Sequence, residues 1–474
     1  MKSFIVFTAL LLSITSLIGQ SAQKQRVIVL TDIEADPDDT QSLVRLLLYA
    51  NEIDIKGIVA TTSCWLQNSI HPKSIERVIE AYGEVQPNLS QHQKDYPKAE
   101  ALLPLIKRGL PVYGMKGVGE GKDSEGSDWI IKVLEEEDAR PLWISTWGGV
   151  NTLAQALYKI KNTKSKKEAS RMFSKLRVYT ISDQDDSGLW IRNNFPELFY
   201  ILSPGDDYGY ATWTGINTFV KGIDNTSISN SWIAEHIQQG HGPLGAAYPD
   251  VAWGVEGDTP AFLSLIPNGL NNAEHPEWGG WGGRYELYQP DFSKMKDGSS
   301  IVEIAPETRA IWTNASDKYT PYVHGAYGRT LKRDSMSFEN DKVTLWRWRD
   351  DFQNDFAARM DWCTQSFEEA NHAPVPVLSH AEEITLTAGE GFTLDAFETT
   401  DPDGDNLTFL WFHYPEAGSY EGSINLGAEN VHRVHLKAPE VDKMETAHII
   451  LKVTDKGEPA LSAYKRVIIT IKPS

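Results

Sequence analysis

The feature that most constrains the fold of this chain is an acidic run between two apolar segments. Residues 27–30 form a short apolar run that predicts a buried strand, and the spacing of apolar residues over 43–50 predicts one face of a helix. Five carboxylates crowd positions 32–39 between them. The acids therefore lie in a turn at the carboxyl end of a strand, which is the edge where open α/β sheets bind ligands.

Carboxylates this close together repel one another unless positive charge lies among them. The run holds no Lys or Arg, and oxygen ligands suit a hard cation, so we expect Asp32, Asp38 and Asp39 to bind calcium. Acidic residues also cap free N–H groups at helix N-termini. That alternative accounts for Asp38 and Asp39, but it leaves Asp32 and Glu34 unexplained.

Charge and hydropathy limit the location and the partners of the protein. Residues 1–21 combine a Lys, an apolar run and small residues, which predicts a cleaved secretory signal and a secreted or periplasmic protein. We expect no lipid anchor and no membrane span, because no Cys stands at the cleavage site and no later stretch is apolar enough. The net charge of -20 argues against nucleic acid and favours a small-molecule glycoside or a polysaccharide as partner.

The pattern after the acidic turn predicts a parallel sheet with flanking helices. Residues 55–61 read as a second strand that completes a βαβ unit, and residues 71–83, 96–108 and 352–363 read as helices. The sequence leaves two points open, namely whether the chain forms a homo-oligomer and whether Cys64 and Cys363 pair.

The acidic stretch resembles the opening of nucleoside hydrolases, in which a strand precedes an Asp-x-Asp-x-x-x-Asp-Asp signature that holds calcium. Aligned without a gap, Asp32, Glu34, Asp38 and Asp39 fall on those four positions. A two-residue insertion would instead place Asp32 on the second position. The resemblance therefore implies a catalytic base at Asp32 or at Glu34, with the register open.

Two later motifs extend this resemblance. The glycine turn that ends at Asn151 resembles the second signature of the family, which implies that the backbone carbonyl of Asn151 is a calcium ligand. Asp258 resembles the late Asp that closes the calcium shell. Gly257 stands where part of the family has a His that protonates the leaving base, so we expect poor cleavage of nucleosides and consider Glu256 and His275 as replacement proton donors.

Other polar and aromatic residues are candidates for binding a sugar. The resemblance implies this role for loop and helix residues, and aromatic faces beside an Arg suit stacking on sugar rings. The alternatives are a local loop contact for the first Asn, a solvated acidic loop for the Asp, and a packed aromatic corner for residues 275–285. The candidates are Asn68, Asp186, Asn193, Asn194, Glu256, His275, Trp278, Trp281 and Arg284.

The C-terminal quarter of the chain changes to a β pattern. Residues 371–377 read as a Pro-containing linker, and short alternating apolar runs after it predict a β-sandwich. The whole chain resembles a secreted bacterial branch of the superfamily that is labelled cellulose-binding. We therefore expect a signal peptide at 1–21, an α/β nucleoside-hydrolase-like domain at 22–372 and an all-β immunoglobulin-like sandwich at 375–474.

The function predicted from these features is calcium-dependent hydrolysis of a glycosidic bond in a ribosyl or related furanosyl substrate. The alternatives are a protein that binds cellulose or another polysaccharide on a hydrolase-like scaffold, and a structural adaptor at a polysaccharide surface. A cluster of carboxylates at the strand ends favours the hydrolase, since a purely binding protein has no need of a charged metal site.

Overall fold

A computed structural model describes residues 23–204, 212–292, 306–324, 331–333 and 336–474, so the predicted signal peptide lies outside the described residues. An eight-stranded sheet forms the first part, in the order β3-β2-β1-β4-β5-β6-β8-β7. Its neighbouring strands are parallel except for β7 and β8, which confirms the predicted mostly parallel sheet. The strands are β1 (Arg26–Thr31), β2 (Asp54–Ala60), β3 (Ile106–Arg108), β4 (Leu142–Thr146), β5 (Leu176–Thr180), β6 (Phe199–Leu202), β7 (Tyr285–Tyr288) and β8 (Ile311–Asn314).

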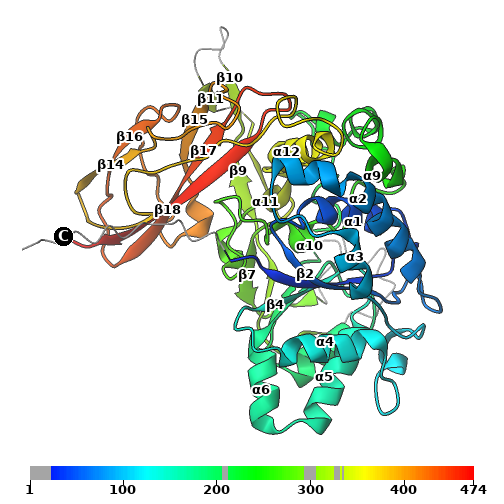
Figure 1. The fold of residues 1–474 in the computed structure, drawn as a ribbon. Helices are drawn as coiled ribbons and strands as arrows, with labels where there is room; N and C mark the ends of the chain where they lie inside the picture. Colours follow the sequence, from blue (N-terminus) through cyan, green and yellow to red (C-terminus); the bar gives the residue numbers. More distant parts are fainter. Residues whose placement is uncertain (1–22, 205–211, 293–305, 325–330, 334–335) are drawn as a thin grey trace, which may run out of the picture.

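Helices cover both faces of this sheet (Figure 1). Successive residues of β1 point to opposite faces, so Val27 and Val29 belong to one buried cluster while Ile28 and Leu30 belong to the other. The first cluster includes α1 (Asp38–Leu48), α2 (Pro72–His92) and α12 (Arg349–Asp361), and the second includes α4 (Glu125–Glu135), α5 (Asn151–Thr163), α6 (Lys166–Lys175) and α7 (Ser187–Asn194). Shorter helices are α3 (Ala99–Leu102), α8 (Asn230–Ile233), α9 (Gly242–Ala247), α10 (Pro260–Leu263) and α11 (Val343–Trp346).

The strand order reverses at β1, which has β2 on one side and β4 on the other. Connections from the two strands therefore leave in opposite directions and open a crevice beyond their carboxyl ends. Thr31 ends β1 and leads into the acidic turn, and Thr146 ends β4 and leads into the glycine turn. The topology thus brings the two predicted signatures to the same edge of the sheet.

One predicted helix is wrong. Residues 96–108 contain only the short α3 and a 3-10 turn, and the segment ends in the strand β3. Pro104 in that turn lacks the N–H that a continuing helix needs, and Ile106 instead pairs with Ile58 of β2. The correction places Arg108 at the carboxyl end of a sheet strand. The predicted helices over 71–83 and 352–363 are confirmed by α2 and α12.

The C-terminal part consists of two sheets packed face to face, as the alternating pattern predicts (Figure 1). One has four strands in the order β13-β18-β17-β15, the other has β14 and β16, and one buried cluster that includes Leu394, Trp411 and Leu451 fills the space between them. The strands are β13 (Glu383–Thr387), β14 (Gly391–Asp395), β15 (Thr408–His413), β16 (Arg433–Lys437), β17 (Glu445–Thr454) and β18 (Ser462–Lys472).

The two parts share buried side chains. Tyr414 and Tyr464 of the sandwich belong to the same hydrophobic cluster as Trp281 and Trp348 of the first part. Buried carboxylates also receive hydrogen bonds across this contact, for example Asp317, which accepts from the Tyr414 hydroxyl at 2.6 Å. The sandwich therefore packs on the first part through a buried, hydrogen-bonded contact.

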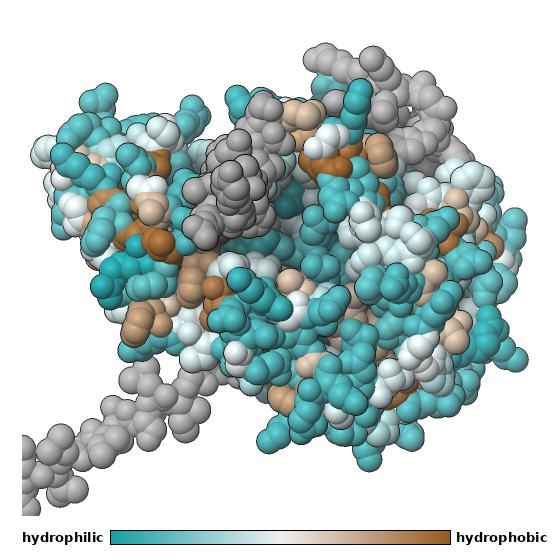
Figure 2. All heavy atoms as spheres, turned by 90° about the horizontal axis from the view of Figure 1, so that it is seen from above, coloured by the Kyte–Doolittle hydropathy of each residue, from teal (hydrophilic) through white to brown (hydrophobic). Residues whose placement is uncertain are grey.

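Three smaller points complete the description. The face of the molecule in Figure 2 is mainly hydrophilic, with hydrophobic side chains in small separate groups. Cys64 and Cys363 are both free thiols. Among the described helices, none combines the length and the apolar composition needed to cross a membrane.

Candidate metal and substrate site

The acidic turn brings several carboxylates together at the end of β1. Asp36, Asp38 and Asp39 each offer an oxygen within 4.8 Å of the others, and Asp38 and Asp39 are buried. The Asp39 carboxylate accepts from the Thr31 hydroxyl. Asp36, rather than either predicted ligand, accepts the backbone N–H of Asp38 at 3.0 Å at the start of α1. No hydrogen bond from a free backbone N–H to the side chain of Asp38 or Asp39 is found in the described structure, as the capping alternative would require, and their carboxylates lie with that of Asp36 in the cluster.

Asp32 and Asp258 complete this group of five carboxylates. Burial raises the pKa of Asp32 to about 6. Burial also raises the pKa of Asp39 and of Asp258 well above the ordinary range, and the charges of neighbouring aspartates raise it further. None of the five has an ion-pair partner among the described residues. Buried negative charge without a counter-charge is the electrostatic environment that a cation relieves.

Glycines are required beside this group because carboxylates approach the backbone closely. A Cβ at Gly148 would lie 2.4 Å from Asp32 Oδ1, and a Cβ at Gly149 would lie 2.5 Å from Asp185 Oδ2. Both distances are far below van der Waals contact. The glycine turn after β4 is therefore packed between two buried acids, which explains why its sequence is Gly-Gly.

Asp185 is a buried acid that the sequence analysis missed in favour of its neighbour. Its carboxylate accepts from the backbone N–H of Asn151 at 3.2 Å and of Ser187 at 2.9 Å, and burial raises its pKa to about 6. Asp186 is exposed and accepts from the backbone N–H of Met115 at 2.7 Å. An acidic run contains no signal that tells which of its members turns inward.

Asn151 stands at the first turn of α5, between Asp185 and the loop after β2. Its side-chain oxygen accepts from the Thr61 hydroxyl at 3.0 Å, and its amide nitrogen donates to the carbonyl of Val112 at 2.8 Å. These contacts engage the side chain of Asn151. Its backbone carbonyl remains the predicted calcium ligand. Asn68 is exposed on the loop that follows β2.

A tryptophan occupies the place next to Gly257. The indole N–H of Trp213 donates to Asp38 Oδ2 at 2.6 Å. A Cβ at residue 257 would lie 2.2 Å from Trp213 Nε1 and 2.7 Å from Asp38 Oδ2. No side chain fits at residue 257 while this indole is present, and the indole contacts Asp38 directly beside Gly257.

Glu34 does not face the carboxylate cluster. Its backbone has a φ of 83°, which is unusual for a residue with a side chain, and turns the carboxylate toward α2. There it pairs with the guanidinium of Arg77 at 2.9 Å and accepts from the Ser74 hydroxyl. Of the two predicted bases, Asp32 lies in the cluster and Glu34 lies outside it.

Glu256 lies in the core instead of on the surface of the site. It is fully buried, pairs with Arg45 at 2.5 Å, and accepts from the hydroxyls of Tyr248 at 2.9 Å and Thr259 at 2.8 Å. These partners satisfy both carboxylate oxygens. Glu256 therefore does not face a ligand, because its carboxylate points toward α1, where it pairs with Arg45.

Asn193 and Asn194 lie at the C-terminal end of α7, and Asp185 lies just before its N-terminal end. The oxygen of Asn193 accepts from the Thr308 hydroxyl at 2.6 Å, and Asn194 donates to the carbonyl of Trp190 at 2.9 Å. Eight helical residues span about 12 Å. The helix therefore separates both residues from the acidic cluster.

The aromatic segment predicted to bind sugar lies at the contact with the sandwich. His275 stacks on Trp278 with ring centroids 3.9 Å apart, and Trp278 meets the edge of His448. Trp281 is buried and donates to the Tyr464 hydroxyl at 3.4 Å. Arg284 pairs with the buried Asp317 at 2.6 Å. These residues fit the packed-corner alternative, since their partners are residues of the domain contact.

Two other tryptophans are exposed on loops that lead to the site. The side chain of Trp65 is 64% exposed and follows Cys64, whose backbone N–H donates to the carbonyl of Gln184 at 2.8 Å. Trp253 is 79% exposed and stands four residues before Gly257. Large aromatic rings left exposed on loops are suited to stacking on sugars. The sequence analysis missed both, because 15 tryptophans offer no local signal of exposure.

Comparisons with known proteins agree with this fold. A family model described as "Cellulose-binding Sde182, nucleoside hydrolase-like domain" matches residues 26–285, and one described as "Cellulose-binding protein Sde0182, C-terminal domain" matches residues 391–471. A solved nucleoside hydrolase-related hypothetical protein from Saccharophagus degradans, associated with carbohydrate metabolism, is 36% identical, with 95% of this chain and 100% of that chain covered and a TM-score of 0.79. These matches confirm the resemblance drawn from the sequence.

Two less similar structures were also found. The effector protein XOO4466 is 8% identical, with 62% of this chain and 88% of that chain covered and a TM-score of 0.33. The type III effector XopQ, complexed with adenosine diphosphate ribose, is 10% identical, with 62% and 89% covered and a TM-score of 0.28. No curated protein matches the chain.

Proposed function

Because the chain belongs to the cellulose-binding Sde182 family, with its nucleoside hydrolase-like domain and C-terminal domain, we propose that it hydrolyses a glycosidic bond with the help of calcium. The observation that carries this proposal is the group of four buried acids, Asp32, Asp38, Asp39 and Asp258, with the half-buried Asp36 beside them. The group lies at the strand ends and has no counter-charge among the described residues. The substrate class that we propose is a ribosyl or related furanosyl glycoside.

The donor set fits a calcium ion. We assign the binding to Asp38, Asp39 and Asp258, with Asp36, Asp32 and the backbone carbonyl of Asn151 as further oxygen donors. Calcium accepts six to eight oxygens in flexible geometry, and carboxylates are its usual ligands. A bound calcium would supply the positive charge that stabilises the ionised carboxylates and attracts the hydroxyl oxygens of a sugar. Trp213 would orient Asp38 through its indole N–H at 2.6 Å.

Asp32 is the residue that we assign as general base. Asp32 lies among the clustered aspartates, and without a metal burial raises the pKa of its carboxyl to about 6, so the group is ionised at neutral pH and is able to accept a proton. Asp32 would accept the proton of the water that attacks the sugar carbon, where positive charge develops as the leaving group departs. Glu256 and His275 are engaged elsewhere, so we assign no side chain as the acid.

Residue 257 is a glycine and not the His that part of the nucleoside hydrolase family has, which favours substrates other than common nucleosides. A purine or pyrimidine must be protonated or stabilised as it leaves, and Gly257 supplies no group for this. We assign sugar stacking to Trp65 and Trp253 on the basis of their exposure. A carbohydrate substrate and the cellulose-binding description of the family also favour a location outside the cytoplasm.

A second candidate function is carbohydrate binding without hydrolysis. The description of the family as cellulose-binding and the two exposed tryptophans favour it. The two functions differ in turnover, because a binder needs the aromatic rings but does not need the proton-accepting Asp32.

The test compares the full-length protein, loaded with calcium, on inosine, uridine, a panel of furanosides and cellulose-derived oligosaccharides. Asp32→Asn is the variant and Asp442→Asn, an exposed residue of the sandwich, is its matched control. Furanoside products that form with wild type and the control, but not with Asp32→Asn, support hydrolysis. Glycan binding without product supports the second function. Efficient cleavage of inosine would contradict the proposed substrate class. If the protein neither binds nor cleaves any of these compounds, both functions are contradicted.

A further inference from the structure

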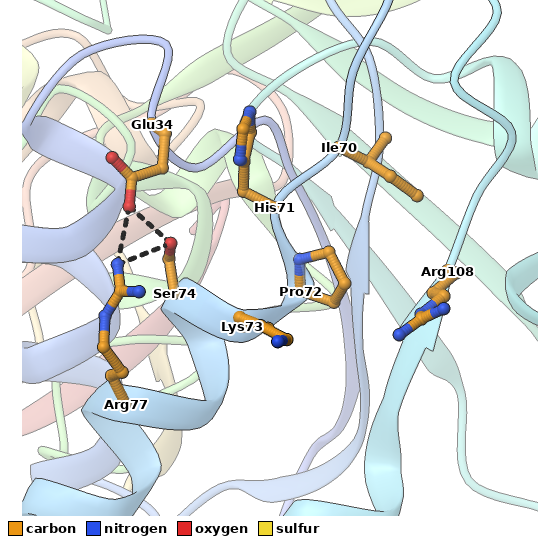
Figure 3. A pocket seen from close by; sticks show the side chains of 8 residues that line it. All are labelled: Glu34, Ile70, His71, Pro72, Lys73, Ser74, Arg77 and Arg108. Atoms are coloured by element: carbon orange, nitrogen blue, oxygen red, sulfur yellow. Dashed lines mark hydrogen bonds and ion pairs between the residues drawn. The ribbon is translucent and has the colours of Figure 1, made fainter.

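A cavity of about 550 Å³ opens beside the acidic turn, and Glu34 is the residue of that turn that lines it. Its polar lining consists mainly of basic side chains (Figure 3). Glu34 and Ser74 are the other polar residues that matter for its chemistry, and the basic residues are His71, Lys73, Arg77 and Arg108. This basic cavity contrasts with the chain as a whole, which carries a net charge of -20.

The fold places these side chains at the functional edge of the sheet. Lys73 and Arg77 lie one turn apart near the start of α2, and Arg108 ends β3. In Figure 3, Lys73 and Arg108 extend toward the same space from these two elements. Glu34 lies only two residues after Asp32 in the turn that follows β1. A ligand in the cavity would therefore be a neighbour of a sugar bound at the acidic cluster.

Two of the cations in this cavity have no partner. The chain contains 65 acidic and 45 basic residues, so a basic side chain has many possible acidic partners. Lys73 and Arg108 are nevertheless exposed and, within the described part of the chain, neither has a hydrogen-bond or ion-pair partner. The single carboxylate, Glu34, pairs with Arg77. The cavity therefore keeps an excess of positive charge.

The ion pair with Glu34 also holds the Arg77 guanidinium in position. The Arg77 guanidinium donates to Glu34 Oε1 at 2.9 Å and to the Ser74 hydroxyl at 2.9 Å, which restrains a long and otherwise mobile side chain. Glu34 reaches these partners through its backbone φ of 83°, a conformation that costs about 1 kcal/mol or more in a residue with a side chain. Strain of this kind is maintained at sites that bind ligands.

From these contacts we infer that the cavity binds a negatively charged group, a carboxylate or a phosphate, on the carbohydrate ligand. Arg108 offers a planar fork that matches both groups, and Lys73 adds a point charge beside it. The inference rests on the proposed function in that the sugar itself would lie at the acidic cluster. It adds that the preferred ligand is an acidic saccharide, such as a uronate or a sugar phosphate, and not a neutral glucan.

The experiment measures binding by calorimetry to the full-length protein with calcium. Two pairs of probes separate the sources of the charge: a galacturonate trimer against cellotriose, and ribose 5-phosphate against ribose. The test variant is the double substitution Lys73→Gln and Arg108→Gln. Its matched control is Lys167→Gln with Arg171→Gln, which removes the same charge from exposed positions of α6. Unchanged melting temperatures check that both variants fold.

The expected result is at least tenfold tighter binding of one charged probe than of its neutral partner, weakened by salt. The test variant should lose this preference and the control should keep it. Preference for the trimer identifies a carboxylate ligand, and preference for ribose 5-phosphate identifies a phosphate. Equal binding of charged and neutral probes, no binding of any probe, or a preference that survives in the test variant would overturn the inference. If the charged probe is preferred but the wild-type protein binds no calcium and turns over no glycoside, the inference holds and the calcium-dependent function fails.

Discussion

The indole of Trp213 fills the space that a side chain at Gly257 would need, since a Cβ on residue 257 would lie 2.2 Å from the indole nitrogen. The same nitrogen donates to Asp38 Oδ2 at 2.6 Å. A glycine in place of the His therefore makes room for the Trp213 indole, whose N–H orients a predicted metal ligand. The indole N–H donates a hydrogen bond but is too weakly acidic to protonate a leaving group.

Replacing Trp213 by Phe should weaken calcium binding about tenfold, because removing a partner that orients a ligand typically lowers affinity by this order. Isothermal titration with calcium measures it. Trp232→Phe, which changes a partly buried tryptophan on α8, is the control. Equal calcium affinity in both variants would show that Asp38 does not need the indole, or is not a ligand.

Asp32→Asn should reduce kcat by about 10² to 10⁴, whereas Glu34→Gln should change kcat by only a few fold. The reason is that Asp32 lies in the carboxylate cluster and Glu34 pairs with Arg77 outside it. Steady-state kinetics on the best furanoside decide between them. A large loss in Glu34→Gln with a small loss in Asp32→Asn would assign the base to residue 34.

Without metal, the protein should lose stability as the pH rises from about 4 through 6. Burial raises the pKa of Asp32 from an ordinary value near 3.8 to about 6, so the folded state holds a proton that the unfolded state releases over this window. The penalty for Asp32 alone is about 3 kcal/mol above the window.

Melting temperatures of chelated protein at pH 5 and pH 7.5 measure this effect. Asp32→Asn, which cannot ionise, should show a smaller decrease than wild type. Calcium should raise the melting temperature more at pH 7.5 than at pH 5, because metal binding requires deprotonated ligands. A calcium effect that is larger at pH 5 would contradict the assigned ligands.

Replacing Trp65 or Trp253 by Ala should weaken binding of neutral oligosaccharides by about two- to tenfold, which corresponds to the loss of one stacking contact. Both side chains are exposed, so the melting temperature should not change. Phe397→Ala, which removes a ring that is 70% exposed on the sandwich, is the control. If the control weakens binding as much as the two tryptophan variants do, the carbohydrate surface lies elsewhere.

Deleting residues 373–474 should lower the melting temperature of the remaining chain while calcium binding is kept. The deletion exposes Trp281 and Trp348, and it removes the hydrogen bond of 2.6 Å that the Tyr414 hydroxyl donates to Asp317. The sandwich contributes none of the assigned calcium ligands. Calorimetry of the truncated protein with and without calcium measures both properties. An unchanged melting temperature would show that the contact contributes little, and loss of calcium binding would show that the site depends on the sandwich.

Much of the fold follows from local pattern. A continuous apolar run before the acids predicts β1, and all six residues of that strand are buried. Alternating runs after residue 384 predict strands of the sandwich. Burial on one face or on both leaves a period in the sequence, so the class of each element can be read without knowing its neighbours. The concentration of acids after β1 likewise identifies the location of the candidate site.

The direction of individual side chains depends on contacts between distant segments. Glu34 turns away from Asp32 because Ser74 and Arg77 of α2 bind it, some forty residues later in the chain. Asp185 turns inward because the glycine turn after β4 leaves space for it. Pairing of Ile106 with Ile58 brings Arg108 to the sheet edge. Each outcome depends on which segments meet in three dimensions, and no period or local composition within a single segment contains that information.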